Sequence, residues 1–296
     1  MLKTVFYGSL QFWLRERNYI KLMEQNGDMQ VLGFCCTDKP EYVNPDDCTA
    51  VSHTDLARMP YDYLLVLNRA EEKETIRTLT QTYCIPREKI LPFRVLQIPG
   101  MTPAVFDEIR KKEWSVLCNN CFAGILFQHL GLRYNSPFKN GWLNCWDVMR
   151  LMKDLPHYMA LEPVFDHWEE ANSPYDQKRF PVFRLDDILL HFNHHTDADA
   201  ALEEYRRRAK RLNPDRLMAI IVSVSSNVEH AFQEFPAEYP KLCISSAPDH
   251  SPDTVWLPAD NSLDLQDKAN QMARDGVGPV DWVKFLLGRK DFLIRR

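Results

Sequence analysis

The sequence predicts an α/β protein of two α/β units: an N-terminal unit with a parallel sheet and a larger C-terminal α/β domain. Three observations predict it. Short apolar runs alternate with amphipathic stretches over the first ninety residues, as parallel strands and connecting helices do. The same alternation resumes after residue 103. Between the two regions lies a proline- and glycine-marked segment, 98–103, which is typical of a boundary. We therefore expect domains at 1–98 and 104–296.

The N-terminal region predicts the elements of a small Rossmann-like half. Its strands are expected at 3–7, 30–36, 62–68 and 89–91, and its helices between Gly8 and Asn26-Gly27 and over 70–83. The first turn carries Gly8 alone, followed by Ser9 and Leu10, where a dinucleotide site needs GxGxxG so that the backbone can approach a pyrophosphate. This turn favours a structural or docking unit without nucleotide over a nucleotide-binding one.

The C-terminal region predicts a second series of strands and helices. Strands are expected at 114–118, 183–192, 216–224, 241–247 and 254–258, and helices at 103–113, 121–130, 145–155, 197–212 and in the last forty residues. Because 183–192 is interpreted as one strand, alternation places Asp187 and His191 on the same face. If this strand and 114–118 belong to one sheet and run parallel, their carboxyl ends lie on the same side.

Composition indicates a globular protein, since 45% of residues are hydrophobic and 26% are charged. The formal net charge of -5 argues against general nucleic-acid binding, because such proteins carry a basic excess. The apolar N-terminal run ends at Gly8, and charges return at Arg15 and Glu16, so neither a signal peptide nor a membrane span is predicted. We expect a cytoplasmic protein.

Cys121 is the candidate nucleophile. It follows a predicted strand and the polar Asn119-Asn120 turn, and it begins a predicted helix. Unpaired backbone N–H groups at a helix start lower the pKa of a thiol, which makes it a better nucleophile. The same N–H groups are suited to an oxyanion hole. A structural interpretation stays open, because cysteine also packs as a small apolar residue at such turns.

A base for this thiol is expected from the stretch DDILLHFNHH (186–195). It contains the candidate bases His191 and His194, and either aspartate at its start, Asp186 or Asp187, is placed to orient a ring. If the strands are parallel, their carboxyl ends share one edge of the sheet, where ligand sites form. We therefore expect one cleft to contain Asn120, Cys121, Tyr134, Asn135, Asp187, His191 and His194.

Alternative interpretations apply to the histidines and the basic run. His191 can pack in the core with one hydrogen bond, and His194 and His195 can be exposed loop residues. A metal site is ranked lower: the sole CxxC, Cys118 to Cys121, has no partner pair, and the three histidines with Asp187 lack a regular ligand spacing. No cofactor motif is recognised.

Candidate binding residues come from the two turns and from a later helix. They are Asn119, Asn120, Tyr134, Asn135, Arg207 and Arg208. The tyrosine and asparagines offer hydrogen bonds to a sugar, and an arginine fork matches phosphate oxygens. The structural alternatives are that the turn at Tyr134 is only a capped loop and that Arg207 and Arg208 lie on a solvated helix end.

Two stretches resemble a bacterial family of domains of unknown function whose members are often labelled exopolysaccharide biosynthesis proteins. They are NNCFAGILFQHLGLRYNSPF (119–138) and FPVFRLDDILLHFNHHTDADAALEEYRRRAKRLN (180–213). The family pattern has a SNNCWGG-type turn, LGLxYNSPF, and later a DIEIHFxHY-type strand before a basic helix that ends in Asn. Here Phe122-Ala123 replaces Trp-Gly, and His195 replaces Tyr. The resemblance spans roughly 114–258, and the matching residues are Asn119, Asn120, Cys121, Gly124, Tyr134, Asn135, Pro137, Phe138, Asp187, His191, His194, Arg207, Arg208 and Asn213.

The resemblance implies a place in capsule or exopolysaccharide biosynthesis, and no reaction. More faintly, the cysteine segment is similar to papain-like cysteine peptidases of the same gene neighbourhoods, which by analogy supports Cys121 with a histidine. The N-terminal unit is similar to Rossmann-like domains fused to sugar-modifying proteins. Two functions stay open: a cysteine-dependent hydrolase or transferase acting on a glycan or its precursor, and a non-catalytic protein that binds a sugar nucleotide or a partner.

All eight cysteines are predicted to be free thiols. They are Cys35, Cys36, Cys48, Cys84, Cys118, Cys121, Cys145 and Cys243. Most lie in apolar, strand-like surroundings, and reduced thiols are the rule for a chain of this size without an export signal. Titration of the denatured protein with a thiol reagent should detect all eight, whereas cysteines found in disulfides would contradict the prediction.

Overall fold

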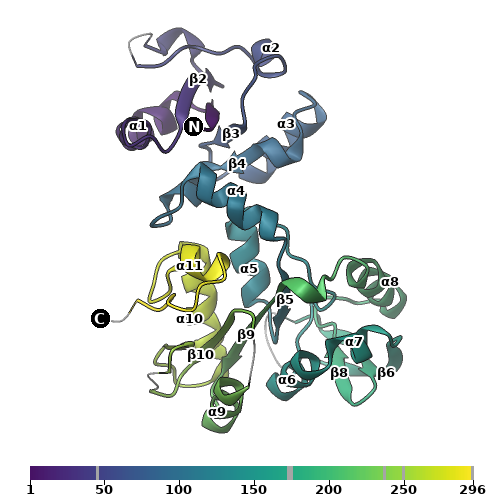
Figure 1. Cartoon of the computed structure of the whole chain (residues 1–296). Helices are drawn as coiled ribbons and strands as arrows, with labels where there is room; N and C mark the ends of the chain where they lie inside the picture. Colours follow the sequence, from purple (N-terminus) through teal and green to yellow (C-terminus); the bar gives the residue numbers. More distant parts are fainter. Residues whose placement is uncertain (45–46, 172–175, 236–237, 249–250, 295–296) are drawn as a thin grey trace. The chain divides into compact units, whose positions relative to one another are not determined.

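The structure of the chain is a computed structural model that describes residues 1–44, 47–171, 176–235, 238–248 and 251–294 (Figure 1). It divides into two compact units, Met1–Glu108 and Ile109–Arg296. The division falls inside helix α4 (Pro103–Lys112), a few residues after the boundary that the sequence predicts. Both units are α/β with parallel sheets, so the predicted fold class is confirmed. In the described ranges, no helix combines the length and the apolar character that crossing a membrane requires.

The N-terminal unit is built on a four-stranded parallel sheet in the order β2-β1-β3-β4. Its strands are β1 (Lys3–Gly8), β2 (Gln30–Cys36), β3 (Tyr63–Val66) and β4 (Ile90–Pro92). Its helices and short 3-10 turns are α1 (Leu10–Gln25), η1 (Pro40–Tyr42), α2 (His53–Leu56), α3 (Glu72–Gln81), η2 (Arg87–Lys89) and η3 (Phe93–Gln97). The strand residues are buried, which explains why their sequence is a continuous apolar run.

The first βα turn of this unit is filled by its own side chains. The Leu10 N–H donates to Asp38 Oδ1 at 2.9 Å, and the Ser9 N–H donates to Asn68 Oδ1 at 3.1 Å. The Leu10 N–H lowers the pKa of the Asp38 carboxyl. A Cβ atom on Gly8 would lie 2.9 Å from Asn68 Oδ1, so glycine permits this close contact. Asp38 and Asn68 therefore accept hydrogen bonds from backbone N–H groups of the kind that bind a pyrophosphate in a dinucleotide site.

The C-terminal unit contains two sheets. The first is parallel, in the order β11-β10-β9-β5, and the second is antiparallel, in the order β6-β7-β8. The strands are β5 (Ser115–Cys118), β6 (Val164–Glu170), β7 (Arg179–Leu185), β8 (Ile188–His191), β9 (Leu217–Ser223), β10 (Lys241–Ser245) and β11 (Thr254–Trp256). The helices that follow α4 are α5 (Phe122–His129), α6 (Cys145–Lys153), α7 (Leu155–Met159), α8 (Ala198–Ala209), η4 (Pro214–Arg216), α9 (Ser226–Glu234), α10 (Ser262–Asp275) and α11 (Trp282–Leu286).

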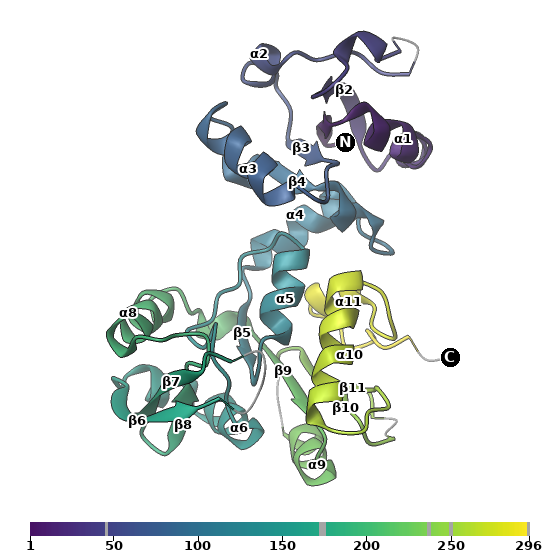
Figure 2. The same cartoon turned by 180° about the vertical axis from the view of Figure 1, so that it is seen from behind.

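Helices cover the parallel sheet of this unit. Helices α5 and α10 lie side by side along it (Figure 2). Helices α6 and α9 also contact it, and the inward residues Ala219 and Ile221 of β9 belong to the same hydrophobic cluster as Phe232 of α9. Because α5 follows β5, α9 follows β9 and α10 follows β11, several helix starts gather at the carboxyl edge of the sheet.

The segment 183–192 is not one strand. Leu185 of β7 pairs with Ile188 of β8, so Asp186 and Asp187 form a two-residue hairpin turn. Asp186 adopts a φ of 56°, a left-handed conformation that such turns require and aspartate tolerates. The expected alternation of Asp187 with His191 is therefore wrong, since they stand at opposite ends of β8. The condition that this segment shares a parallel sheet with β5 is not met, because β7 and β8 belong to the antiparallel sheet.

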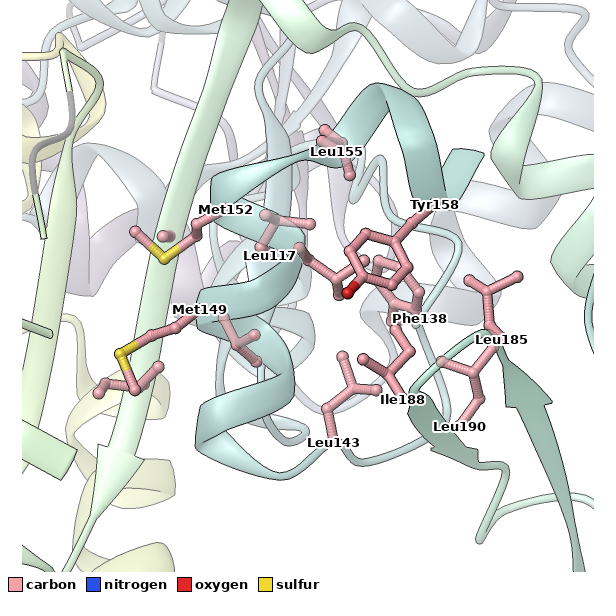
Figure 3. Close-up of a cluster of buried hydrophobic side chains, with 14 of the residues drawn as sticks. Leu117, Phe138, Leu143, Met149, Met152, Leu155, Tyr158, Leu185, Ile188 and Leu190 are labelled. Carbon is pink, nitrogen blue, oxygen red and sulfur yellow. The ribbon is translucent and has the colours of Figure 1, made fainter. Parts of the chain in front are cut away.

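A buried hydrophobic cluster joins the antiparallel hairpin to α6 and the parallel sheet. Figure 3 shows Met149 and Met152 from α6 together with Leu117 from β5. The hairpin contributes Ile188 and Leu190, and every one of these side chains is buried. Burying one such side chain stabilises the fold by about 1.5–3 kcal/mol. This cluster fixes the hairpin against the edge of the parallel sheet where β5 ends.

A backbone bridge beside this cluster depends on a glycine. The Trp142 N–H donates to the His191 carbonyl at 2.9 Å, and the His191 N–H donates to the Trp142 carbonyl at 3.2 Å. A Cβ atom on the preceding Gly141 would lie 2.7 Å from the His191 oxygen. Backbone on both sides leaves no flexible atom to move away.

We predict that Gly141→Ala destabilises the protein by about 1–3 kcal/mol, because the added methyl group forces the bridge apart. Gly124→Ala is the matched control. It lies inside α5, its Cβ would meet Tyr134 ring carbons at an ordinary 3.7 and 3.8 Å, and it should stabilise by about 0.5–1 kcal/mol through helix propensity. Urea unfolding measures both, and equal stability of the two variants would contradict the role of the close contact.

Candidate active site

A cavity of about 950 Å³ lies at the carboxyl ends of β5 and β9. Residues 119–121 and 222–225 line it from the strand ends, and residues 142–146 line it from the start of α6. The hairpin side contributes Glu169, Asp176, Phe180, Asn193 and His194, and α10 contributes Ser262, Leu263, Leu265, Gln266, Asn270 and Arg274. Its volume is at the upper end of the range for small-molecule sites.

Cys121 and His194 face each other in this cavity. The Sγ atom of Cys121 lies 3.0 Å from Nε2 of His194. Cys121 is the N-cap residue of α5, and His194 stands in the loop between β8 and α8. At this distance a proton can pass directly between the thiol and the ring, as nucleophilic catalysis by cysteine requires. Two of the four predicted catalytic residues are thus in contact.

The environment of Cys121 opposes the predicted low pKa. Burial, with a smaller contribution from the charge of Asp176, raises the pKa of the Cys121 thiol to about 11. The helix N–H groups expected to act on it have other partners. The Phe122 N–H donates to Asn120 Oδ1 at 3.0 Å, and the Asn120 and Ala123 N–H groups bond the sulfur of Cys118. The resting thiol is therefore protonated, and these donors do not form the expected oxyanion hole.

Asp176 places a negative charge in the same cavity. Its Oδ1 accepts a hydrogen bond of 2.6 Å from Asn193 Nδ2. Asn193 is buried and directly precedes His194, so one side chain connects the carboxylate to the loop that carries the base. A carboxylate near this pair disfavours the thiolate, whereas it stabilises an imidazolium that forms during a reaction.

The two predicted asparagines of the β5 turn line the cavity in different ways. Asn119 bridges the two strand ends, since its Nδ2 donates to the Val222 carbonyl at 3.0 Å and its Oδ1 accepts from the Val222 N–H at 2.9 Å. Asn120 caps the start of α5 and donates from Nδ2 to Gln266 Oε1. Asn119 therefore holds the site together, and Asn120 links α5 to α10.

His191 lies beside the cavity and does not contact Cys121. Its Nδ1 is 2.8 Å from Glu169 Oε2, and its ring stacks on Trp142 with centroids 3.6 Å apart. Burial lowers its pKa, so the neutral ring is favoured. His191 thereby fixes two residues of the cavity wall, Glu169 and Trp142. Of the two histidines predicted as a base for Cys121, His194 is the one in contact with the thiol.

Asp187 lies outside the cavity, which corrects its predicted place in the site. Its Oδ1 accepts a hydrogen bond of 2.6 Å from the Tyr158 hydroxyl, and its Oδ2 lies 3.4 Å from Arg150 Nε. The hairpin turn carries it to the end of β8 remote from His191. Asp186 bonds His157 at the same turn.

The other predicted binding residues also lie outside the cavity lining. The Tyr134 ring packs on Phe127, and the Asn135 carbonyl accepts the Val116 N–H at 2.9 Å, which extends the edge of β5. On α8, both Arg207 and the buried Arg208 pair with Glu204, and Arg208 also donates to the Lys139 carbonyl. Tyr134 and Asn135, which were expected in one cleft with Cys121, do not line the cavity, and neither do the predicted binding residues Arg207 and Arg208.

Several residues of the cavity were not predicted from the sequence. They are Trp142, Cys145, Trp146, Glu169, Asp176, Asn193, Ser262, Gln266, Asn270 and Arg274. One signal for part of this set was available: Ser262, Gln266, Asn270 and Arg274 recur every fourth residue of a helix. Within the described ranges, no group of three or more His, Cys, Asp or Glu side chains is arranged to hold a metal ion.

Comparison with known proteins identifies the region that contains the Cys121–His194 pair. Residues 95–245 match the family described as Domain of unknown function (DUF1919). The chain is also 26% identical over 121 residues to an uncharacterised protein of Haemophilus influenzae. That similarity covers 41% of this chain and 55% of the relative, so the chain matches about half of the relative's length.

We predict that Asp176→Asn speeds the alkylation of Cys121 by iodoacetamide. The change removes a negative charge that raises the pKa of the thiol, so more thiolate is present at a fixed pH near 8. Asparagine keeps the oxygen that accepts from Asn193. The expected increase is roughly two- to tenfold, as for the loss of one nearby charge at a partly buried site.

Peptide mapping by mass spectrometry measures alkylation at Cys121 separately from the other cysteines. Asp187→Asn is the matched control, because that carboxylate bonds Tyr158 and Arg150 and does not line the cavity. A rate unchanged in Asp176→Asn, or raised equally in the control, would show that Asp176 does not act on the thiol.

Proposed function

We propose that this chain, which belongs to the family described as Domain of unknown function (DUF1919), is a cysteine-dependent acyl hydrolase or transferase. The observation that carries the proposal is the 3.0 Å contact between Cys121 Sγ and His194 Nε2 inside a cavity at the carboxyl edge of a parallel sheet. A nucleophile and a base within hydrogen-bond distance are what covalent catalysis by a thiol requires.

In the proposed reaction His194 acts as a general base. Its Nε2 takes the proton from Cys121 as the sulfur forms a bond to the carbonyl carbon of an ester or thioester. The imidazolium then gives this proton to the leaving oxygen or sulfur, and an acyl-enzyme remains. Water or an acceptor hydroxyl attacks the carbonyl next, loses its proton to His194, and the thiol recovers it. The raised thiol pKa supports proton removal during attack rather than a preformed ion pair.

The substrate class of the proposal is a glycan or a glycan precursor. Two tryptophans and several amide and hydroxyl side chains line the cavity, which suits a ligand with apolar faces and many hydroxyl groups. The resemblance in the sequence to proteins labelled for exopolysaccharide biosynthesis supports a place in capsule or exopolysaccharide assembly. The substrate class and the pathway are both part of the proposal.

A second candidate is a non-catalytic protein that binds a sugar nucleotide or a partner in the same pathway. The observation that favours it is the thiol itself, since a half-buried cysteine with a pKa raised to about 11 is also typical of a structural residue. Under this candidate the cavity binds its ligand unchanged, and Cys121 and His194 form a hydrogen bond that only orders the wall.

We predict that wild-type protein incubated with p-nitrophenyl acetate acquires one acetyl group on Cys121. His194→Gln should slow this acylation by about 10²–10⁴-fold, which is the usual contribution of a general base. Cys121→Ala should abolish acylation at this peptide. Release of p-nitrophenol and mass spectrometry of the peptides measure the two results.

Cys145→Ala is the matched control for the nucleophile. Cys145 also lines the cavity, is half-buried, and has a pKa raised to about 11, but its sulfur contacts the Asn119 amide and the Val222 carbonyl instead of a histidine. It should keep wild-type acylation. Acylation that does not depend on His194, or that occurs equally at Cys145, would favour the binding candidate.

A further inference from the structure

A polar stripe runs along the side of α10 that lines the cavity. It consists of Ser262, Gln266, Asn270 and Arg274, each four residues after the previous one. Residues at this spacing share one face of a helix, and the stripe therefore extends over roughly 18 Å at the standard rise per residue. Leu263 and Leu265 line the same cavity beside the stripe. A helix face that packs on a protein core is normally apolar, so four polar residues in a row along a cavity point to a ligand with polar groups.

One end of the stripe is connected to the start of α5 by side-chain amides. Asn120 Oδ1 accepts the Phe122 backbone N–H, which leaves Asn120 Nδ2 to donate to Gln266 Oε1. Gln266 Nε2 in turn donates to Asn270 Oδ1 at 2.7 Å. Because the series begins at a backbone N–H, which can only donate, the orientation of all three amides is fixed. Gln266, the second residue of the stripe, is thus held by the neighbour of Cys121.

The same series leaves the Asn270 amide with a donor for the cavity. Asn270 is 8% exposed and lines the cavity, and its Oδ1 already accepts from Gln266. No acceptor for its Nδ2 occurs among the described residues. The Nδ2 group is therefore available to donate a hydrogen bond to a ligand oxygen in the cavity.

The far end of the stripe carries a positive charge. Arg274 is exposed, and no carboxylate of the described chain forms an ion pair with it. Among the described residues that line the cavity it is the single arginine or lysine. The two carboxylates of the cavity, Glu169 and Asp176, are bonded to His191 and Asn193. Arg274 is therefore the positive charge that the described lining of the cavity offers to a ligand.

We infer that the α10 stripe binds the anionic end of the substrate, a polar molecule with a carboxylate or phosphate group that Arg274 and the Asn270 amide receive. Gln266 and Arg274 are eight residues apart, which places the anionic group roughly 12 Å along the helix from the end nearest Cys121. The orientation of the substrate, with its acyl group at Cys121, rests on the proposed function. The anion site itself rests on α10 alone.

The experiment uses the full chain with Cys121→Ala, so that binding is measured without any acyl transfer. The probes are D-glucuronate, D-glucose 1-phosphate and neutral D-glucose. Nuclear magnetic resonance titration follows the Arg274 Nε–H and the Asn270 side-chain amide signals. At least one anionic probe should bind about tenfold or more tightly than glucose, as one charge-assisted hydrogen bond provides. The stronger probe of the two identifies the group as carboxylate or phosphate.

Arg274→Gln should reduce this preference to within about twofold, whereas Arg289→Gln should keep it, since Arg289 is exposed in the same unit and does not line the cavity. Asn270→Asp keeps the acceptor for Gln266 and replaces the donor by a negative charge, so it should also remove the preference. Circular dichroism and urea unfolding confirm that each variant is folded.

Equal binding of the three probes, or a preference that persists in Arg274→Gln, would overturn the inference. Both results are obtained without the nucleophile, so they leave the acylation result for Cys121 and His194 unaffected. Conversely, failure of acylation in the wild-type protein with retained binding at Arg274 would refute the proposed function and leave the anion site in place.

Discussion

The candidate site depends on the packing of the β7–β8 hairpin against α6 and the parallel sheet. Cys121 and His194 follow strands of separate sheets, and among the described residues no ladder hydrogen bond joins those two sheets directly. The hydrophobic cluster around Ile188, Leu190 and Met149, together with the backbone bridge between Trp142 and His191, fixes their separation. Catalytic side chains must be held to within about 0.5 Å of their productive positions. Tight packing of apolar side chains outside the cavity therefore determines the contact between Cys121 and His194 inside it.

The cavity wall is ordered mainly by side-chain hydrogen bonds that begin at backbone groups. Asn119 holds the ends of β5 and β9 together, and Asn120 orients the amides of α10. His191 orients Glu169, and Asn193 holds Asp176. The Asn119 pair satisfies the backbone groups of Val222 at the end of β9, as polar groups inside a stable fold require. The residues that resemble the family pattern thus include positioning residues as well as the candidate nucleophile and base.

The sequence predicted the fold class and nearly every element of both parallel sheets, because buried parallel strands are continuous apolar runs and their helices are amphipathic. It did not predict the hairpin. In RLDDILL the turn residues Asp186 and Asp187 stand between apolar runs, and nothing in a period-two pattern distinguishes a turn from two polar positions of one strand. The prediction of one continuous strand therefore placed Asp187 in the site, whereas the hairpin turn places it outside the cavity.

The sequence identified the candidate nucleophile from its place after a strand and its partner from the histidine stretch. It did not predict the raised pKa of the Cys121 thiol. Whether a helix start lowers the pKa of a cysteine depends on where each N–H points, and here Asn120 and Cys118 take the donors. The side chains that α10 and the hairpin add to the cavity lie far from Cys121 in the sequence, so local spacing does not connect them to it. Their four-residue recurrence in α10 was visible as helix periodicity only.

The two βα turns of this chain show how the same backbone geometry is used in different ways. After β1, the N–H groups at the start of α1 are satisfied by Asp38 and Asn68, and no donor is left for an anionic ligand at Leu10 and Ser9. After β5, Asn120 likewise takes a helix N–H, but its own amide passes a donor on through Gln266 to Asn270 in the cavity. In the first unit the backbone donors are bonded to side chains of the turn itself. In the second unit the hydrogen-bonded amides of Asn120 and Gln266 lead to Asn270, whose Nδ2 group is left for the cavity. The proposed chemistry and the proposed anion site therefore both belong to the C-terminal unit, where strand ends, α6 and α10 leave polar groups free to meet a ligand.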